Sequence, residues 1–320
     1  MKRITTVKEL RCELEPARRN GLRIGLVPTM GALHDGHLSL IRRARQACEL
    51  VVVSLFVNPM QFNEPTDLEG YPRQQERDSR LAHEAGADIL FAPTLEEVYP
   101  AGFATSVEVL GITDRLEGAV RGNGHFRGVT TVVTKLLNMT LPDVAFFGQK
   151  DAQQVVVIKR LVEDLNLPVQ IETCPTVRET GGLAMSSRNA HLSPDERAQA
   201  LALFCALEAA RELAGNGERR SERLLAGARG AMAPFGLEPE YLALVDPETL
   251  EDLAELTAPA LLAIAARVGA TRLIDNVRLE PAVPPADLSQ ANRSPQLQAD
   301  PLPHREHPGE ARQKAALIAQ

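Results

Sequence analysis

The stretch RIGLVPTMGALHDGH, residues 23–37, predicts a buried strand followed at once by a helix. Its first part, Arg23–Val27, is a short apolar run of the length typical of buried strands. Residues 36–49 then carry apolar side chains at helical spacing, among them Leu38, Ile41 and Cys48. A strand that leads through a tight loop into a helix is the first half of a βαβ unit, so this stretch predicts a parallel sheet.

The same alternation continues through the first half of the chain. Further strands are predicted at 51–56, 88–91, 144–147 and, more weakly, 170–174, and further helices at 73–86, 127–139 and 150–164. The pattern predicts an α/β fold over residues 1–176, a Rossmann-like parallel sheet with flanking helices. Ligands of such sheets bind beyond the carboxyl ends of the strands, so the loops after Val27, Phe56 and Phe147 are the expected site.

The second half has a different pattern. Residues 194–232 are rich in Ala and Leu and predict one or two amphipathic helices broken at 215–217, and short strands are expected at 241–245, 261–265 and 271–274. A smaller α+β domain over 177–280 follows. Residues 281–320 contain seven prolines and no aromatic residue, which predicts a disordered tail, with a short helix near 310–319 or a docking role as alternatives.

Composition excludes several classes of protein. The 320 residues carry a formal net charge of −7, which argues against a nucleic-acid partner. Four widely spaced cysteines, without a CxxC pair, favour neither a zinc cage nor a disulfide framework. The start of the chain, MKRITTVKELRCELE, lacks the apolar core of a signal peptide, and no apolar run approaches the ~20 residues of a membrane span. We therefore expect a cytoplasmic protein without a membrane partner.

His34 and His37 carry the chemistry of the first loop. Three residues apart at the start of a helix, their rings can face one ligand. The free N–H groups and the dipole of that helix end favour phosphate, and Gly31 and Gly36 let the backbone approach it closely. The alternatives are a helix cap with two exposed histidines and a zinc pair, but no third zinc ligand of suitable spacing lies nearby. The loop's place between strand and helix favours a nucleotide site.

The segment PTMGALHDGHLSLI resembles the HxGH-bearing loop of the pantothenate synthetase (pantoate–β-alanine ligase) family, within the HxGH nucleotidyltransferase superfamily. Four more segments match that family in order: FVNPMQF at 56–62, HFRGV at 125–129, FGQKDAQQ at 147–154 and LAMSSRN at 183–189. The resemblance covers roughly residues 1–280. It implies ATP-dependent condensation of pantoate with β-alanine through a pantoyl adenylate, with Mg²⁺ as cofactor, release of AMP and pyrophosphate, and a homodimer formed through the N-terminal domain.

The resemblance also implies roles for individual residues. It implies five catalytic residues, which contact the triphosphate and the transition state: His34, His37, Lys150, Ser187 and Arg188. Further ATP contacts are implied for Thr29, Met30, Gly148, Asp151, Met185 and Ser186, and pantoate contacts for Met30, Gln61, Phe62 and Gln154. Asn58 and Arg121 are additional candidates for the site, and Asp78 is the expected protein contact to Mg²⁺ or its waters.

The chain departs from the family pattern at three places. The segment RGNGHF at 121–126 is one residue longer than the usual Arg-Pro-Gly-His-Phe, Gly181 replaces an Asp, and Arg77 replaces an acid beside Asp78. Two other functions are alternatives to the ligase. One is a nucleotidyltransferase that passes AMP or CMP to a phosphate ester, and such an enzyme needs extra basic residues. The other is a nucleotide-responsive binding protein, which predicts ATP binding without pyrophosphate release.

Overall fold

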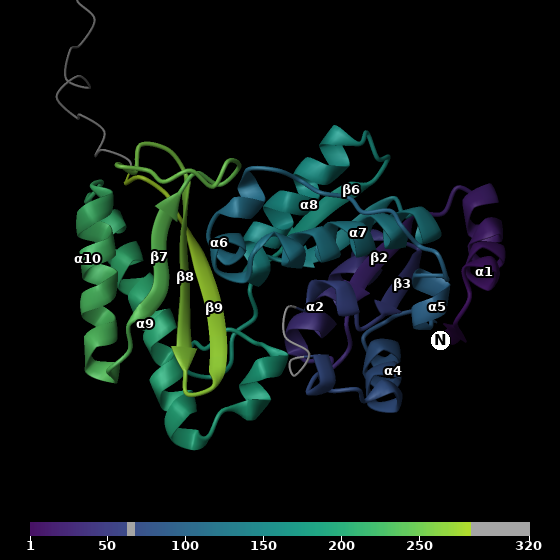
Figure 1. Ribbon diagram of the computed structural model, residues 1–320, viewed down its shortest axis with the longest axis horizontal. Coiled ribbons are helices and arrows are strands. Elements are labelled where there is room, and N and C mark those ends of the chain that lie inside the picture. The colour runs from purple at the N-terminus through teal and green to yellow at the C-terminus, as the bar shows by residue number, and fades with distance from the viewer. Residues whose placement is uncertain (63–67, 283–320) are drawn as a thin grey trace, which may run out of the picture. The chain divides into compact units, whose positions relative to one another are not determined.

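A computed structural model describes residues 1–62 and 68–282 (Figure 1). Its larger sheet has six parallel strands in the order β1-β4-β3-β2-β5-β6. The strands are β1 (Lys2–Ile4), β2 (Ile24–Thr29), β3 (Leu50–Leu55), β4 (Ile89–Phe91), β5 (Val144–Gly148) and β6 (Gln170–Cys174). The predicted α/β class and parallel sheet are confirmed. The predicted disordered tail lies, from residue 283 onward, outside the described residues.

Helices cover both faces of this sheet, which is why its strands are apolar throughout. In β3, Val52 packs on one face while Val51 and Val53 pack on the other, as the two-residue period of a strand requires. The first face is covered by α1 (Val7–Arg19), α7 (Asn123–Thr140) and α8 (Ala152–Asp164), and the second by α2 (Asp35–Ala47) and α4 (Gln75–Glu84).

The strands predicted from apolar runs are all present, but β1 and α1 were not predicted. The first 19 residues alternate charge with single apolar residues, so no apolar run marks a strand. Helical spacing is nonetheless present, because Leu10, Leu14 and Ala17 lie on one buried face of α1. Thr6 caps this helix by accepting a hydrogen bond from the backbone N–H of Glu9.

The order of the strands places the expected loops together. The chain leaves β2 through α2 for β3 on one side, whereas β5 pairs with β2 on the other. The order therefore reverses between β2 and β5, and the loops after these two strands open side by side at the carboxyl edge. His34 and His37 follow β2, and Lys150 follows β5.

The second half forms a three-stranded antiparallel sheet, β7 (Pro239–Val245), β8 (Ala260–Val268) and β9 (Thr271–Leu279). Its apolar side chains pack with α9 (Pro194–Gly215) and α10 (Ser221–Met232), which confirms the predicted helix break at 215–217. The domain division at residue 176 stays a prediction. The remaining short elements are α5 (Leu95–Val98), α6 (Glu117–Arg121), η1 (Pro59–Gln61), η2 (Ile112–Asp114), η3 (Gln149–Asp151), η4 (Ser187–His191) and η5 (Ala233–Phe235).

Within the described ranges, every helix is too short or too polar to cross a bilayer.

Candidate active site

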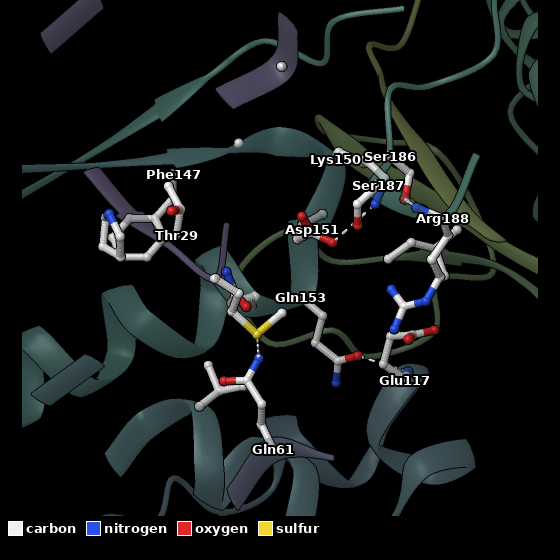
Figure 2. Close-up of a pocket in the computed structure, with 18 of the residues that line it drawn as sticks. Thr29, Gln61, Glu117, Phe147, Lys150, Asp151, Gln153, Ser186, Ser187 and Arg188 are labelled. Atoms are coloured by element: carbon white, nitrogen blue, oxygen red, sulfur yellow. Dashed lines mark hydrogen bonds and ion pairs between the residues drawn. The ribbon is translucent and has the colours of Figure 1, made fainter. Parts of the chain in front are cut away.

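A cavity of about 280 Å³ lies at the carboxyl edge of the parallel sheet and is also lined by residues of β7, β8 and β9 (Figure 2). Its lining includes every residue predicted for the nucleotide and pantoate, from both halves of the chain. These are Thr29, Met30, His34, His37, Asn58, Gln61, Phe62, Arg121, Gly148, Lys150, Asp151, Gln154, Met185, Ser186, Ser187 and Arg188. Asp78 is not among the lining residues.

The two histidines form the first turn of α2, with ring centroids 4.1 Å apart. His34 caps the helix: its Nδ1 accepts the backbone N–H of Gly36 at 3.2 Å, and the Nδ1 of His37 accepts the N–H of His34 at 3.4 Å. A ring nitrogen that accepts a backbone N–H carries no proton, so the neutral tautomer of each ring has its hydrogen on Nε2. The cap and the phosphate-donor interpretations are therefore compatible, because one ring nitrogen serves each purpose.

Both rings are neutral at physiological pH. Burial lowers the pKa of His34 to about 4, assisted by the charge of Lys150. Burial also lowers the pKa of His37 to about 3, assisted by His34. His125, whose Nδ1 lies 2.8 Å from the carbonyl oxygen of Gln61, has its pKa lowered to about 4 by burial and by Arg121. Neutral imidazoles donate hydrogen bonds to phosphate and are not counter-charges for it.

These lowered pKa values predict acid lability. A folded-state pKa below the unfolded value of 6.5 means that the unfolded chain binds more protons between pH 6.5 and pH 4. The stabilisation is complete above pH 6.5 and is lost as the pH falls through that window. Each histidine should lower the free energy of unfolding by about 1 kcal/mol per pH unit. Denaturant unfolding at pH 7.5, 6.0 and 5.0 measures this slope.

The matched variant for this experiment is His37→Gln. A Gln at the third position of a helix retains the capping hydrogen bond but does not titrate. The variant should show a slope shallower by about 1 kcal/mol per pH unit than the parent. Identical slopes in parent and variant would show that His37 is not held neutral by the fold.

Two amides that line the cavity, those of Asn58 and Gln61, have fixed orientations. The Oδ1 of Asn58 accepts the backbone N–H of Met60 at 3.3 Å and the hydroxyl of Tyr99 at 2.9 Å, while its Nδ2 donates to the carbonyl oxygen of Gly128 at 3.1 Å. The same Nδ2 donates to Oε1 of Gln61 at 3.0 Å. Gln61 therefore directs its Nε2 toward Sδ of Met30, at 3.0 Å, and its Oε1 toward Asn58. Gln61 presents a donor to the cavity, and Asn58, only 1% exposed, orients it.

Lys150 and the segment 186–188 lie together on another part of the wall (Figure 2). The Nζ of Lys150 is 3.3 Å from Oδ1 of Asp151, and the Lys150 side chain is only 18% exposed. Ser186 accepts the backbone N–H of Arg188 at 3.3 Å and so begins the turn that holds Ser187 and Arg188. A Cβ on Gly148 would meet no atom within 4 Å, so the absence of a side chain there leaves open space for a ligand.

Asp78, the expected protein contact to magnesium or its waters, is engaged within the protein. Its carboxylate is 1% exposed, and its two oxygens accept the backbone N–H groups of Ala32 and Leu33 at 2.9 and 2.8 Å. Arg77, the unusual neighbour, donates to the carbonyl oxygen of Leu33 at 3.0 Å. Both side chains hold the loop before His34 in place, and the carboxylate is already bound within the protein.

The other two departures from the family pattern, at Gly181 and in residues 121–126, affect the local backbone. Gly181 has a φ of +102°, where a residue with a side chain is strained, so this glycine belongs to the turn of the hairpin before Met185. Gly122, with a φ of +77°, separates α6 from α7. Arg121 still lines the cavity, and its Nε donates to Oε2 of Glu117 at 2.9 Å. The longer loop therefore leaves Arg121 at the site.

Glu117, Tyr241 and Arg272 also line the cavity, and sequence reasoning missed all three. Glu117 is 7% exposed and accepts hydrogen bonds from Arg272 at 2.7 Å and from the hydroxyl of Tyr241 at 2.9 Å. Burial opposes the ionisation of Glu117, but the hydrogen bond and charge of Arg272 outweigh it and lower its pKa to about 2. These contacts join α6 to β7 and β9. No local motif marks them, because the partners are more than 120 residues apart.

No group of three or more His, Cys, Asp or Glu side chains in residues 1–62 and 68–282 could hold a metal ion. The described residues therefore do not fit a protein-built magnesium cage.

Comparison with known proteins identifies the family. The family model for pantoate-beta-alanine ligase matches residues 2–278. A pantothenate synthetase of Heliobacterium modesticaldum is 52% identical over 281 residues, covering 88% of this chain and all of the relative. The crystal structure of pantothenate synthetase from Thermus thermophilus superposes with a TM-score of 0.83 at 48% identity, covering 88% of this chain and all of that one.

A second solved structure is a pantoate-beta-alanine ligase from Francisella tularensis, described as complexed with beta-gamma ATP and beta-alanine. It has a TM-score of 0.72 and 35% identity, and the match covers 87% of this chain and 97% of that one. The residues that line the cavity fall within the matched range 2–278. The chain belongs to the pantoate–β-alanine ligase family and is an enzyme that uses ATP to condense pantoate with β-alanine.

Proposed function

We propose that the cavity carries out this condensation in two steps, each assigned to named residues. A carboxylate resists attack by an amine because its leaving group would be oxide. In the first step, a carboxylate oxygen of pantoate attacks the α-phosphorus of ATP, and the bond to the bridging oxygen of pyrophosphate breaks. In the second, the β-alanine amine attacks the carbonyl of the pantoyl adenylate, AMP leaves with the electron pair, and the amine loses a proton.

The observation that carries this proposal is that two chemically different sets of side chains line one cavity. One set offers donors for anionic oxygens: the Nε2–H groups of His34 and His37 and the ammonium of Lys150. The other offers the neutral amides of Gln61 and Gln154. The first suits a triphosphate whose charge shifts during the reaction, and the second suits a hydroxy acid held beside it.

The remaining residues complete the nucleotide side of the proposal. Ser186, Ser187 and Arg188 are assigned to the phosphates, since hydroxyls and a guanidinium bind phosphate oxygens well. Asp151, whose side chain is 48% exposed, is assigned to the ribose hydroxyls, and Thr29 and Met185 to the nucleotide. Met30 and Phe62 supply the apolar wall against pantoate.

The neutral amide of Gln61 weakens the nucleotidyltransferase alternative. An acceptor phosphate carries about two negative charges at neutral pH and calls for cations near it. The groups that contact the side chain of Gln61, Asn58 and Met30, are uncharged. These uncharged contacts favour a ligand that carries one carboxylate and hydroxyl groups over a phosphate ester. A binding protein without turnover is the second alternative, and only an assay of the reaction separates it from the ligase.

Magnesium, the homodimer and the cytoplasmic location complete the proposal. Mg²⁺ commonly keeps several waters and binds substrate phosphates, so we assign it to the ATP phosphates and route no step through a protein ligand. Homodimerisation is consistent with exposed apolar side chains on the first half, such as Leu110, which is 78% exposed. Four cysteines without a disulfide partner suit the reducing cytoplasm.

Pyrophosphate release tests the proposed function. Purified protein receives ATP, Mg²⁺ and pantoate, with or without β-alanine. We expect sustained release only when both pantoate and β-alanine are present, and at most one equivalent per site without the amine, because the adenylate then stays bound. ATP binding without any release would support the binding-protein alternative, and release without pantoate would indicate a different acceptor.

A further inference from the structure

Two buried polar residues of β9, on the second sheet, are linked by hydrogen bonds to the segments assigned to the triphosphate. Asp275 and Asn276 are consecutive residues of this strand, and each is 4% exposed. Both line the cavity, yet neither belongs to a segment that motif reasoning singled out. Buried polar side chains require partners, so the partners of these two show what they do.

Asn276 uses its whole side-chain amide on the turn that carries Lys150. Its Nδ2 donates to the carbonyl oxygens of Gln149 and Lys150, both at 2.9 Å. Its Oδ1 accepts from Nε2 of Gln149 at 3.0 Å. The turn Gln149–Asp151 is a single 3-10 turn that begins at Gly148 without a side-chain cap. Asn276 supplies hydrogen-bond donors to two carbonyl groups of this turn and so fixes its backbone.

Asp275 supports the other phosphate-facing segment. Its carboxylate oxygens accept from Nη1 and Nη2 of Arg178, a two-pronged ion pair. The Nη1 of Arg178 also donates to the carbonyl oxygen of Gly182 at 2.9 Å. Arg178 faces Ala184 across a hairpin, and this hairpin leads directly into the segment 186–188. A bidentate pair fixes both position and angle, so Asp275 orients the base of that segment.

We propose that Asn276 is a positioning residue for Lys150, and that Asp275 acts in the same way, through Arg178, on the segment carrying Ser186, Ser187 and Arg188. One dipeptide of the second sheet thus sets the spacing between the two halves of the phosphate-binding group, which are the turn with Lys150 and the segment 186–188. This rests on the proposed function, in which both halves contact the phosphates. Displacement of a catalytic group by about 1 Å can lower a rate by about 100-fold, so control of this spacing is control of the rate.

A double-mutant cycle tests the proposal. Asn276→Ala should lower kcat by about 30-fold, because Lys150 then samples other positions. If Asn276 acts through Lys150, the same substitution in a Lys150→Ala background should change kcat by less than about 3-fold, since the group it positions is absent. Each variant is assayed for kcat, for the KM of ATP and for the rate of the first pyrophosphate release.

Two further variants separate positioning from loss of packing. Asn276→Asp keeps the shape and the acceptor for Gln149, but it places a carboxylate against two carbonyl oxygens, so it should lower kcat at least as much as Asn276→Ala. A purely structural role predicts the reverse order. Val277→Ala, on the next residue of β9 and partly buried in the second-half core, is the control for general destabilisation and should leave kcat unchanged.

If the Asn276 variants do not fold, a second double-mutant cycle at Arg178 tests the proposal. Arg178→Lys keeps the charge but loses the two-pronged contact with Asp275. It should lower kcat about 10-fold in the parent and by less than about 2-fold in an Arg188→Ala background. If the parent enzyme turns over but the effects are additive in both cycles, the positioning role is refuted and the proposed function is not. Failure of the parent enzyme to release pyrophosphate would instead refute the proposed function.

Discussion

Replacing His37 with alanine should lower kcat by about 100- to 1,000-fold. The substitution removes one preorganised donor from the place where charge develops on the phosphates, and losses of this size follow removal of such a donor. It also removes the side chain that accepts the N–H of His34, so the first turn of α2 becomes less stable. Steady-state kinetics with saturating ATP and pantoate measure the first effect, and thermal unfolding measures the second.

His37→Gln is the matched control, because it separates the cap from the chemistry. Gln restores the capping acceptor, so the melting temperature should return close to that of the parent. The Nε2–H donor of the imidazole is lost, so kcat should stay low. If kcat recovers together with the melting temperature, His37 serves only as a helix cap and does not donate to the phosphates.

Replacing Gln61 with glutamate should raise the KM for pantoate by more than about 100-fold. Asn58 fixes one end of this side chain, so the substitution changes mainly the atom that faces the cavity, from an N–H donor to an anionic oxygen. A donor that binds a substrate anion then becomes a charge that repels it, and the combined loss exceeds that of one neutral hydrogen bond. The KM for ATP should change far less.

The control for charge is Gln74→Glu. Gln74 is exposed at the start of α4, outside the cavity, and the substitution adds the same negative charge. It should leave both KM values within about 2-fold of the parent. Equal effects of the two substitutions on the KM for pantoate would show that net charge, and not the orientation of Gln61, controls binding.

Most of the parallel sheet could be predicted from the sequence because its signals are local. A run such as Val51–Val53 is apolar since helices cover both faces, and the helix after it has its own spacing. The first strand was missed because Lys2–Ile4 is short and lies at the edge of the sheet, where only one residue is buried. Edge strands of this kind carry almost no pattern.

The site was predictable where function requires particular residue types in one loop, as at His34 and His37. It was not predictable where a role depends on distant partners. Asp78 carries a chemistry that suits magnesium, but two backbone N–H groups already bind its oxygens. Asn276 carries no motif, yet its three hydrogen bonds reach a turn 127 and 126 residues away. Such roles arise only when folding brings the partners together.

The adenylate route is the central claim, and oxygen transfer tests it most directly. Pantoate labelled with ¹⁸O in its carboxylate is turned over with ATP and β-alanine, and the AMP and pyrophosphate are examined by mass spectrometry. The account predicts one ¹⁸O in the phosphate of each AMP and none in pyrophosphate, because the carboxylate oxygen that attacks the α-phosphorus leaves with AMP. Label found in pyrophosphate, or retained entirely in the amide product and water, would contradict it.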